Sequence, residues 1–254
     1  IHQLAREYWF YETPFPVNYL GYHFLEERWL RSYKNIPTIT VSESTKIDLT
    51  DLGFRKVYVV GEGLNFEPLM KVQKKAGHPI VVYAGRLKKA KRPDHAVAAF
   101  KIVKKKVSDA ELWVIGDGPF KNKLKKISSN DVEFFGSVSD EERRKLIEEA
   151  WVLVNPSVRE GFGLNVLEAN ALGVPSVAYD VPGLRDAIID GKTGLLVSSG
   201  DIEALARAVL RILTDIAFRT MLSEEALAHS RNFSWDKVAD NFMRIIRAVL
   251  TGSD

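Results

Sequence analysis

The sequence contains no cysteine among its 254 residues, which excludes disulfide bonds and thiol chemistry. No apolar run approaches the roughly 20 residues that a helix needs to span a bilayer. The five histidines are scattered, and the sequence has no Asp-x-Asp pair that could hold a metal. We therefore expect no metal, no cofactor and no membrane-spanning segment. The lack of cysteine is compatible with a reducing compartment, and we expect the protein in the cytoplasm, with the inner face of the membrane as an alternative place.

Two common nucleotide-binding motifs are also absent. Gly-x-Gly pairs begin at Gly61, Gly116 and Gly161, but none continues to the third glycine of G-x-G-x-x-G. No run of the form G-x-x-x-x-G-K-[S/T] occurs. The sequence therefore argues against an NAD-dependent enzyme and against a P-loop nucleotidase.

Charge is distributed unevenly along the chain. The net charge is only +3, yet residues 71–126 hold 16 lysines and arginines against 4 acidic residues, which leaves a balance of −9 elsewhere. This pattern is typical of solvated helix faces, and it also suits a basic face for anionic membrane lipids or a phosphate-bearing acceptor. No aromatic residues interleave the lysine runs, so we expect no nucleic-acid partner.

Short β-branched runs alternate with helical patterns, which indicates parallel strands joined by helices. The expected strands are residues 38–41, 57–60, 80–83, 112–115, 132–135, 152–154, 176–179 and 194–197. Several are almost entirely apolar, as strands buried on both faces should be. Apolar residues at helical spacing predict helices over 96–107, 202–212 and 238–249.

The division of the chain is expected near residues 61–78, where glycines and prolines surround a lysine-rich piece without a clear period. Residues 71–232 suffice for a complete Rossmann-like, doubly wound parallel sheet. Residues 1–70 hold only two expected strands, so we interpret them as the remnant of an N-terminal α/β domain with a linker. Residues 233–254 form a C-terminal helix that is expected to cross back to the N-terminal part.

Aromatic residues gather at the start of the chain. Ten of the 26 lie within the first 33 positions. We interpret them as core residues of the partial N-terminal domain, now partly uncovered. The alternative is a surface for an acceptor or a membrane interface.

The most informative stretch runs from Glu160 to Glu168. Gly161 and Gly163 stand where a helix is expected to begin, so a ligand could approach bare backbone N–H groups there. Those groups and the helix dipole favour a phosphate. At about 1.5 Å rise per residue, the two carboxylates stand roughly 10 Å apart along the axis. This gap suits a sugar at one end and a ribose at the other, with a diphosphate between them.

This block resembles the Glu-x7-Glu motif of family 4 retaining glycosyltransferases, which are glycosyl transferases of group 1 with the GT-B fold. The resemblance includes Pro156-Ser157, Glu168-Ala169 and the Gly-Val-Pro run that begins at Gly173. It is strongest over residues 80–197 and implies an α/β protein of GT-B type. The implied reaction, part of glycan biosynthesis, moves a hexosyl unit from a nucleotide diphosphate sugar to an acceptor hydroxyl. It retains the anomeric configuration and needs no metal.

The resemblance also implies roles for particular residues. The catalytic residues would be Glu160, Arg86 and Lys91. The donor-binding residues would be Gly85, Gly116, Gly136, Val138, Gly161, Phe162, Gly163, Leu164, Asn165 and Glu168. Glu160 would contact the sugar, Arg86 and Lys91 the diphosphate, and Glu168 the ribose. The glycines at 116 and 136 are also ordinary residues of strand-to-helix turns, so a turn alone would explain them.

Three further features are less specific. His2 matches a family histidine near the donor sugar, or it is an incidental terminal residue. Ser42-Glu43-Ser44 resembles the family's strand-to-helix turn near the cleft, but we prefer a simple helix cap in which Ser42 or Ser44 accepts from the first N–H groups. Where the family usually shows Pro-Asn-Gly-Val-Asp, this chain has Gly61-Glu62-Gly63-Leu64-Asn65.

The acceptor, a glycan, a lipid or a small molecule, is not revealed by the sequence. The front of the N-terminal domain is expected to lie before Ile1 in a longer protein, so we expect this chain alone to be inactive. Two alternatives stay open at this point: a nucleotide-sugar-binding module and a nucleotide-sugar epimerase of the GT-B fold.

Overall fold

Six parallel strands form the main sheet of the computed structural model, which describes residues 1–252. The strands are β3 (Ile80–Ala84), β4 (Glu111–Ile115), β5 (Val132–Gly136), β6 (Val152–Asn155), β7 (Ser176–Tyr179) and β8 (Gly194–Val197). Their order is β5-β4-β3-β6-β7-β8, so the direction of winding reverses between β3 and β6. Ligands of doubly wound sheets bind at the carboxyl ends of the strands beside such a reversal.

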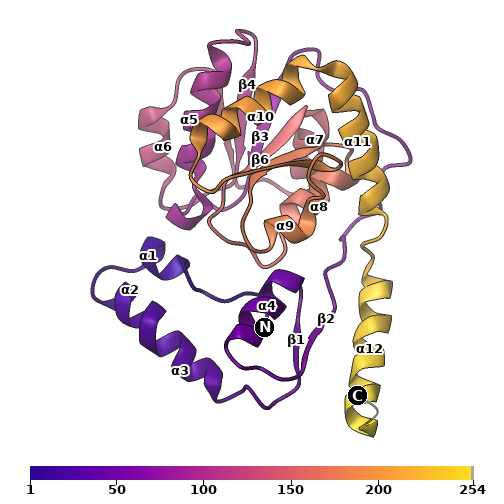
Figure 1. Cartoon of the computed structure of the whole chain (residues 1–254). Helices are drawn as coiled ribbons and strands as arrows, with labels where there is room; N and C mark the ends of the chain where they lie inside the picture. Colours follow the sequence, from indigo (N-terminus) through magenta and orange to yellow (C-terminus); the bar gives the residue numbers. More distant parts are fainter. Residues whose placement is uncertain (253–254) are drawn as a thin grey trace.

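Helices cover both faces of this sheet (Figure 1). They are α5 (Pro93–Lys104), α6 (Lys121–Ile127), α7 (Asp140–Glu149), α8 (Leu164–Ala171), α9 (Leu184–Ala187), α10 (Ile202–Thr214) and α11 (Ile216–Ser230), with a 3-10 turn at Lys89–Lys91. Helix α5 packs against α10, and α8 packs against α11. The expected helical stripe to residue 107 is too long, because α5 ends at Lys104. Val107 still packs against the core and donates its N–H to the carbonyl of Val103.

The strands were predictable because they are buried on both faces. Every residue of β3, β6 and β7 is buried, and all eight expected strands are present, within one residue at either end. In continuous β-branched runs of this kind, apolar side chains on both faces of the strand pack against the helices that cover a doubly wound sheet. The sequence prediction of an α/β fold with a parallel sheet is therefore confirmed.

The N-terminal part is smaller. Its elements are α1 (Tyr8–Glu12), α2 (Val17–Leu20), a π-helical turn (Gly21–Leu25), α3 (Glu26–Arg31), β1 (Thr38–Thr40), α4 (Glu43–Asp51) and β2 (Val57–Val59). Strands β1 and β2 form a separate parallel pair, and Leu4, Leu49 and Phe54 form a small core. Six of the early aromatic side chains are exposed: Phe10, Phe15, Tyr19, Phe24, Trp29 and Tyr33. Their interpretation as core residues of a larger domain stays a prediction.

The last helix, α12 (Trp235–Thr251), leaves the main sheet and runs beside β2 (Figure 1). Trp235 donates its indole N–H to Asn65 at 2.8 Å, and Asn241 donates to the carbonyl of Val59 at 3.3 Å. These contacts join the last helix to β2 and to the segment that follows it. Among residues 1–252, no helix has the length and apolar character needed to cross a membrane.

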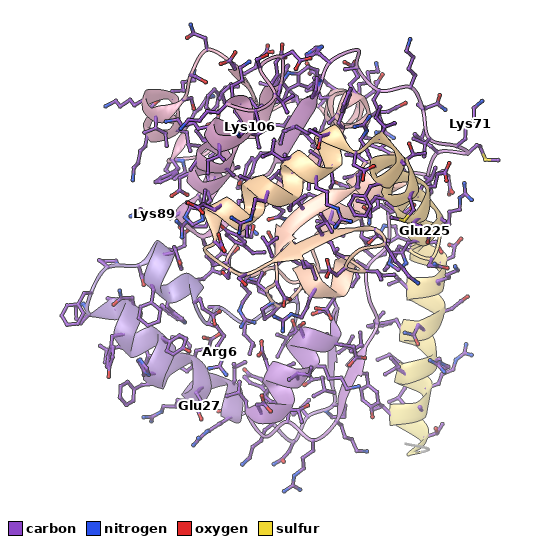
Figure 2. All side chains as sticks on the ribbon, turned by 45° about the horizontal axis from the view of Figure 1, so that its top comes forward. Arg6, Glu27, Lys71, Lys89, Lys106 and Glu225 are labelled. Atoms are coloured by element: carbon purple, nitrogen blue, oxygen red, sulfur yellow. The ribbon has the colours of Figure 1, made fainter. Side chains whose placement is uncertain are left out.

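The lysine-rich segment, residues 71–126, extends over much of the sheet domain. Figure 2 labels Lys71, Lys89 and Lys106 at separate places over the sheet domain. Part of its charge is also neutralised locally, because Lys104 pairs with Asp131 and Lys121 pairs with Asp117. This spread favours the interpretation as solvated helix faces.

Candidate functional site

A cavity of about 680 Å³ lies at the carboxyl ends of β3 to β6, beside the reversal of winding. Every predicted site residue except Glu168 lines it. These residues are His2, Gly85, Arg86, Lys91, Gly116, Gly136, Val138, Glu160, Gly161, Phe162, Gly163, Leu164 and Asn165. The volume is typical of a site for a small organic ligand. The structure therefore gathers loops that are far apart in sequence around one space.

The carboxylate of Glu160 is held on both oxygens. Ser157 donates its hydroxyl to Oε1 at 2.8 Å, and Lys91 Nζ lies 2.6 Å from Oε2. The loop is shaped by the end of β6, where Asn155 accepts from the N–H of Ser157. Gly183 is required next to it, because a Cβ there would lie 2.3 Å from the Glu160 carbonyl oxygen. These contacts fix the carboxylate at the cavity wall.

Lys91 is half enclosed between two parts of the chain. Its ammonium pairs with Glu160 and lies 5.6 Å from the centre of the Tyr8 ring. Burial alone would lower the pKa of Lys91, but the Glu160 carboxylate and the Tyr8 hydroxyl together outweigh burial and raise this pKa above its ordinary value. Lys91 is therefore a permanent cation at neutral pH.

Helix α8 presents an uncapped N-terminus to the cavity. Gly163 precedes it with φ 91°, a conformation that favours glycine, and no side chain caps the helix. The side-chain amide of Asn165 is already engaged, because it donates to the carbonyl of Ala84 and accepts from the Asn155 side chain. The first N–H groups of a helix have no partner within it, which makes this end a natural anion site.

Arg86 follows β3 on the opposite side of the reversal. Its side chain is exposed toward the cavity, and it forms no ion pair within residues 1–252. The neighbouring loop approaches closely, because a Cβ on Gly116 would lie 2.1 Å from the Gly85 carbonyl oxygen. The Arg86 guanidinium is therefore available at the cavity, where it can bind an anion with two parallel hydrogen bonds.

Glu168 is placed differently from the other predicted residues. Both of its oxygens pair with Arg143 of α7, at 2.5 and 2.8 Å, and Glu168 is not among the residues that line the cavity. Arg143, which sequence reasoning missed, does line it. The pair joins α7 to α8, and no local pattern in either helix signals it.

The opposite wall comes from the N-terminal part and consists of His2, Gln3, Val41 and Glu62. His2 Nδ1 lies 3.3 Å from Glu62 Oε1. The two walls meet closely, because a Cβ on Gly161 would lie 2.9 Å from the His2 carbonyl oxygen. Glu62 was also missed, although its two flanking glycines and its departure from the family pattern marked the segment.

Arg159 links the two walls and was not predicted. This buried residue precedes Glu160 and pairs with Glu7 at 2.7 Å and with Asp48 at 2.5 Å. Tyr8 donates its hydroxyl to the Arg159 carbonyl at 3.2 Å. The N-terminal part therefore contacts the loop that carries Glu160 through two ion pairs and one hydrogen bond.

Two smaller expectations concern a cap and metals. Ser42 caps α4 by accepting from the N–H of Thr45 at 3.2 Å, as predicted. The described part of the chain holds no group of three or more potential metal ligands.

A family model described as glycosyl transferases group 1 matches residues 66–229. A D-inositol 3-phosphate glycosyltransferase of Salinispora tropica is 32% identical over 180 residues, which is 65% of this chain and 37% of the relative. A glycogen synthase of Mycobacterium tuberculosis is 29% identical over 225 residues, 84% of this chain and 54% of the relative. The chain thus spans about a third to a half of these relatives.

Among solved structures, a sucrose-phosphate synthase of Thermosynechococcus elongatus superposes with a TM-score of 0.80 and 26% identity. The match covers 99% of this chain and 67% of that one. Together with the parallel sheet, this likeness confirms the expected fold of GT-B type.

Proposed function

Since this chain belongs to the family of glycosyl transferases group 1, we propose that it binds a nucleotide diphosphate sugar and transfers the hexosyl unit to an acceptor hydroxyl. The proposal includes retention of anomeric configuration and no metal. Its main support is that Arg86, Lys91 and the uncapped tip of α8 face one cavity. Two cations beside a row of free N–H groups are a recognition site for a diphosphate. We also propose a cytoplasmic location and a glycan, lipid or small-molecule acceptor.

Each end of the donor has a matching part of the cavity. The diphosphate lies over Leu164 and Asn165, where negative charge that develops as the sugar leaves is stabilised by N–H groups and by Arg86. The sugar lies against the Glu160 carboxylate, whose fixed oxygens accept hydrogen bonds from hydroxyl groups. Lys91 stands between the two groups and can contact both.

The nucleoside end is assigned to the loops at Gly136 and Val138 and to the Arg143–Glu168 pair. Because Arg143 takes both oxygens of Glu168, the carboxylate reaches the ribose only with its remaining lone pairs. Arg143 therefore acts as a positioning residue for Glu168 in this proposal. It also neutralises a carboxylate that would otherwise repel the nearby diphosphate.

Calorimetric titration tests the proposal. UDP, GDP and ADP are first screened by thermal shift, since a ligand that binds only the folded state raises its stability. The nucleotide that binds is then compared with its nucleoside. We expect Arg86→Ala and Lys91→Ala to weaken the nucleotide by about tenfold or more, as for lost charge-assisted hydrogen bonds, and to change the nucleoside little.

Lys89→Ala is the matched control, because Lys89 is an exposed lysine in the same turn and does not line the cavity. Equal losses for nucleotide and nucleoside, or an equal loss in Lys89→Ala, would contradict the assignment. A turnover assay with the donor that binds then separates an enzyme from a binding module.

A further inference from the structure

Glu62 is a charged group of the cavity to which the proposed donor site gives no role. Glu62 lies on the N-terminal wall, and only 8% of its surface is exposed. The only basic side chain that pairs with it within residues 1–252 is His2, whose side chain is 81% exposed. An ion pair with so exposed a partner contributes little to stability, so the pair does not account for the burial of a carboxylate.

The backbone fixes Glu62 in this place. Gly61 has φ 82°, a conformation open to glycine but rarely to other residues. Gly63 lies against the start of α12, where a Cβ would stand 2.7 Å from the backbone nitrogen of Trp235. Leu64 then donates its N–H to the carbonyl of Phe233 at 3.3 Å. The segment is therefore anchored on α12, and Glu62 is held at the cavity rather than free to turn into solvent.

The chemistry of the two walls differs. The wall from the sheet domain carries Arg86, Lys91 and the positive end of α8, which suit phosphate oxygens. A carboxylate repels phosphate and can only accept hydrogen bonds, so its ligands must donate them. His2 stands beside one oxygen of Glu62, and the second oxygen has no ion pair within the described chain. The group that fits this wall is a neutral hydroxyl.

We propose that Glu62 binds and orients a hydroxyl group of a polyhydroxylated acceptor, across the cavity from the donor. The inference rests on the proposed function, because it places the acceptor opposite the donor phosphates. Gly161 and the His2 backbone are almost in contact, so this wall lies beside the loop assigned to the donor sugar. An acceptor hydroxyl held there is next to the sugar that it would receive.

The test fills the donor site first and then measures the acceptor probe. The protein is saturated with whichever of UDP-glucose, GDP-glucose or ADP-glucose raises its unfolding midpoint, and D-glucose is titrated by calorimetry. We expect Glu62→Gln to weaken D-glucose by about tenfold or more, because it removes the charge from a charge-assisted hydrogen bond. Binding of the nucleotide sugar should stay within about twofold.

Two further variants complete the design. Glu43→Gln is the matched control, since Glu43 lies in the same part of the chain with a 63% exposed side chain that pairs with Lys46 outside the cavity. It should change neither affinity. Glu62→Asp keeps the charge but withdraws it by one methylene group, and should weaken D-glucose less than Glu62→Gln does. If Glu62→Gln does not fold, the D-glucose affinity of Glu62→Asp provides the test.

The outcomes separate the two proposals. Failure of all three nucleotide sugars to bind would count against the proposed function itself. A nucleotide sugar that binds, together with D-glucose affinity unchanged in Glu62→Gln or absent in the unaltered protein, would overturn the acceptor role. Equal weakening of donor and D-glucose would also overturn it, because Glu62 would then belong to the donor site.

Discussion

Arg159 provides the sharpest test of how the two parts of the chain are joined. Its side chain is 6% exposed and pairs with two carboxylates of unequal burial, Glu7 at 45% and Asp48 at 21% exposed. Replacing it with methionine keeps most of the volume and removes the charge. The two carboxylates then lose their partner, and the loop that carries Glu160 loses its ion pairs with the N-terminal part.

The magnitude follows from the exposure of each partner. The pair with Glu7 is close to solvent and contributes about 0–1 kcal/mol. Leaving Asp48 unpaired in a half-buried place costs about 1–3 kcal/mol. We therefore expect Arg159→Met to lower the free energy of unfolding by about 1–4 kcal/mol. Asp48→Asn should cost about 1–2 kcal/mol and Glu7→Gln less than 1 kcal/mol.

Urea unfolding followed by tryptophan fluorescence measures these values, because Trp9 and Trp29 lie in the part that Arg159 holds. Arg55→Met is the control, since Arg55 is exposed in the same part of the chain and forms no ion pair within residues 1–252. It should change the unfolding free energy by less than about 0.5 kcal/mol. The reasoning fails if Arg159→Met costs no more than Arg55→Met, or if Glu7→Gln costs as much as Asp48→Asn.

Two other predictions concern stability. Burial lowers the pKa of Lys75 to about 8, below the value near 10.5 of the unfolded chain. Between pH 8 and 10 the unfolded state therefore binds more protons than the folded state. As the pH rises over this range, the unfolding free energy of the unaltered protein should increase by about 2 kcal/mol relative to that of Lys75→Met. The same pH dependence of the unfolding free energy in both proteins would refute this prediction. Gly183→Ala should lower the thermal midpoint clearly more than Gly191→Ala. Both glycines have positive φ, but only at Gly183 would a Cβ meet Glu160; equal shifts would leave backbone strain as the only effect.

The parts of the fold that could be predicted are local in sequence. A buried parallel strand such as β3 is a continuous β-branched run, and the α8 tip is marked by glycines within a few residues of Glu160. The ion pairs were not predictable in this way. Arg159 and Asp48 are 111 residues apart, and Arg143 and Glu168 are 25 apart on different helices. The periodicity of the sequence does not indicate such contacts, because they depend on how the folded helices, strands and loops pack against one another.

The same distinction applies inside the site. The resemblance implied roles for both Lys91 and Glu160 but assigned them separately, to the diphosphate and to the sugar, whereas the structure pairs them at 2.6 Å. An ammonium has three N–H donors, and Glu160 uses one of them. Under the proposed function, Lys91 can therefore bind a phosphate oxygen without releasing Glu160. The sugar attached to that phosphate must then lie beside the fixed carboxylate. This ordering places the sugar next to the wall that carries Glu62, because Gly161 lies against the backbone of His2.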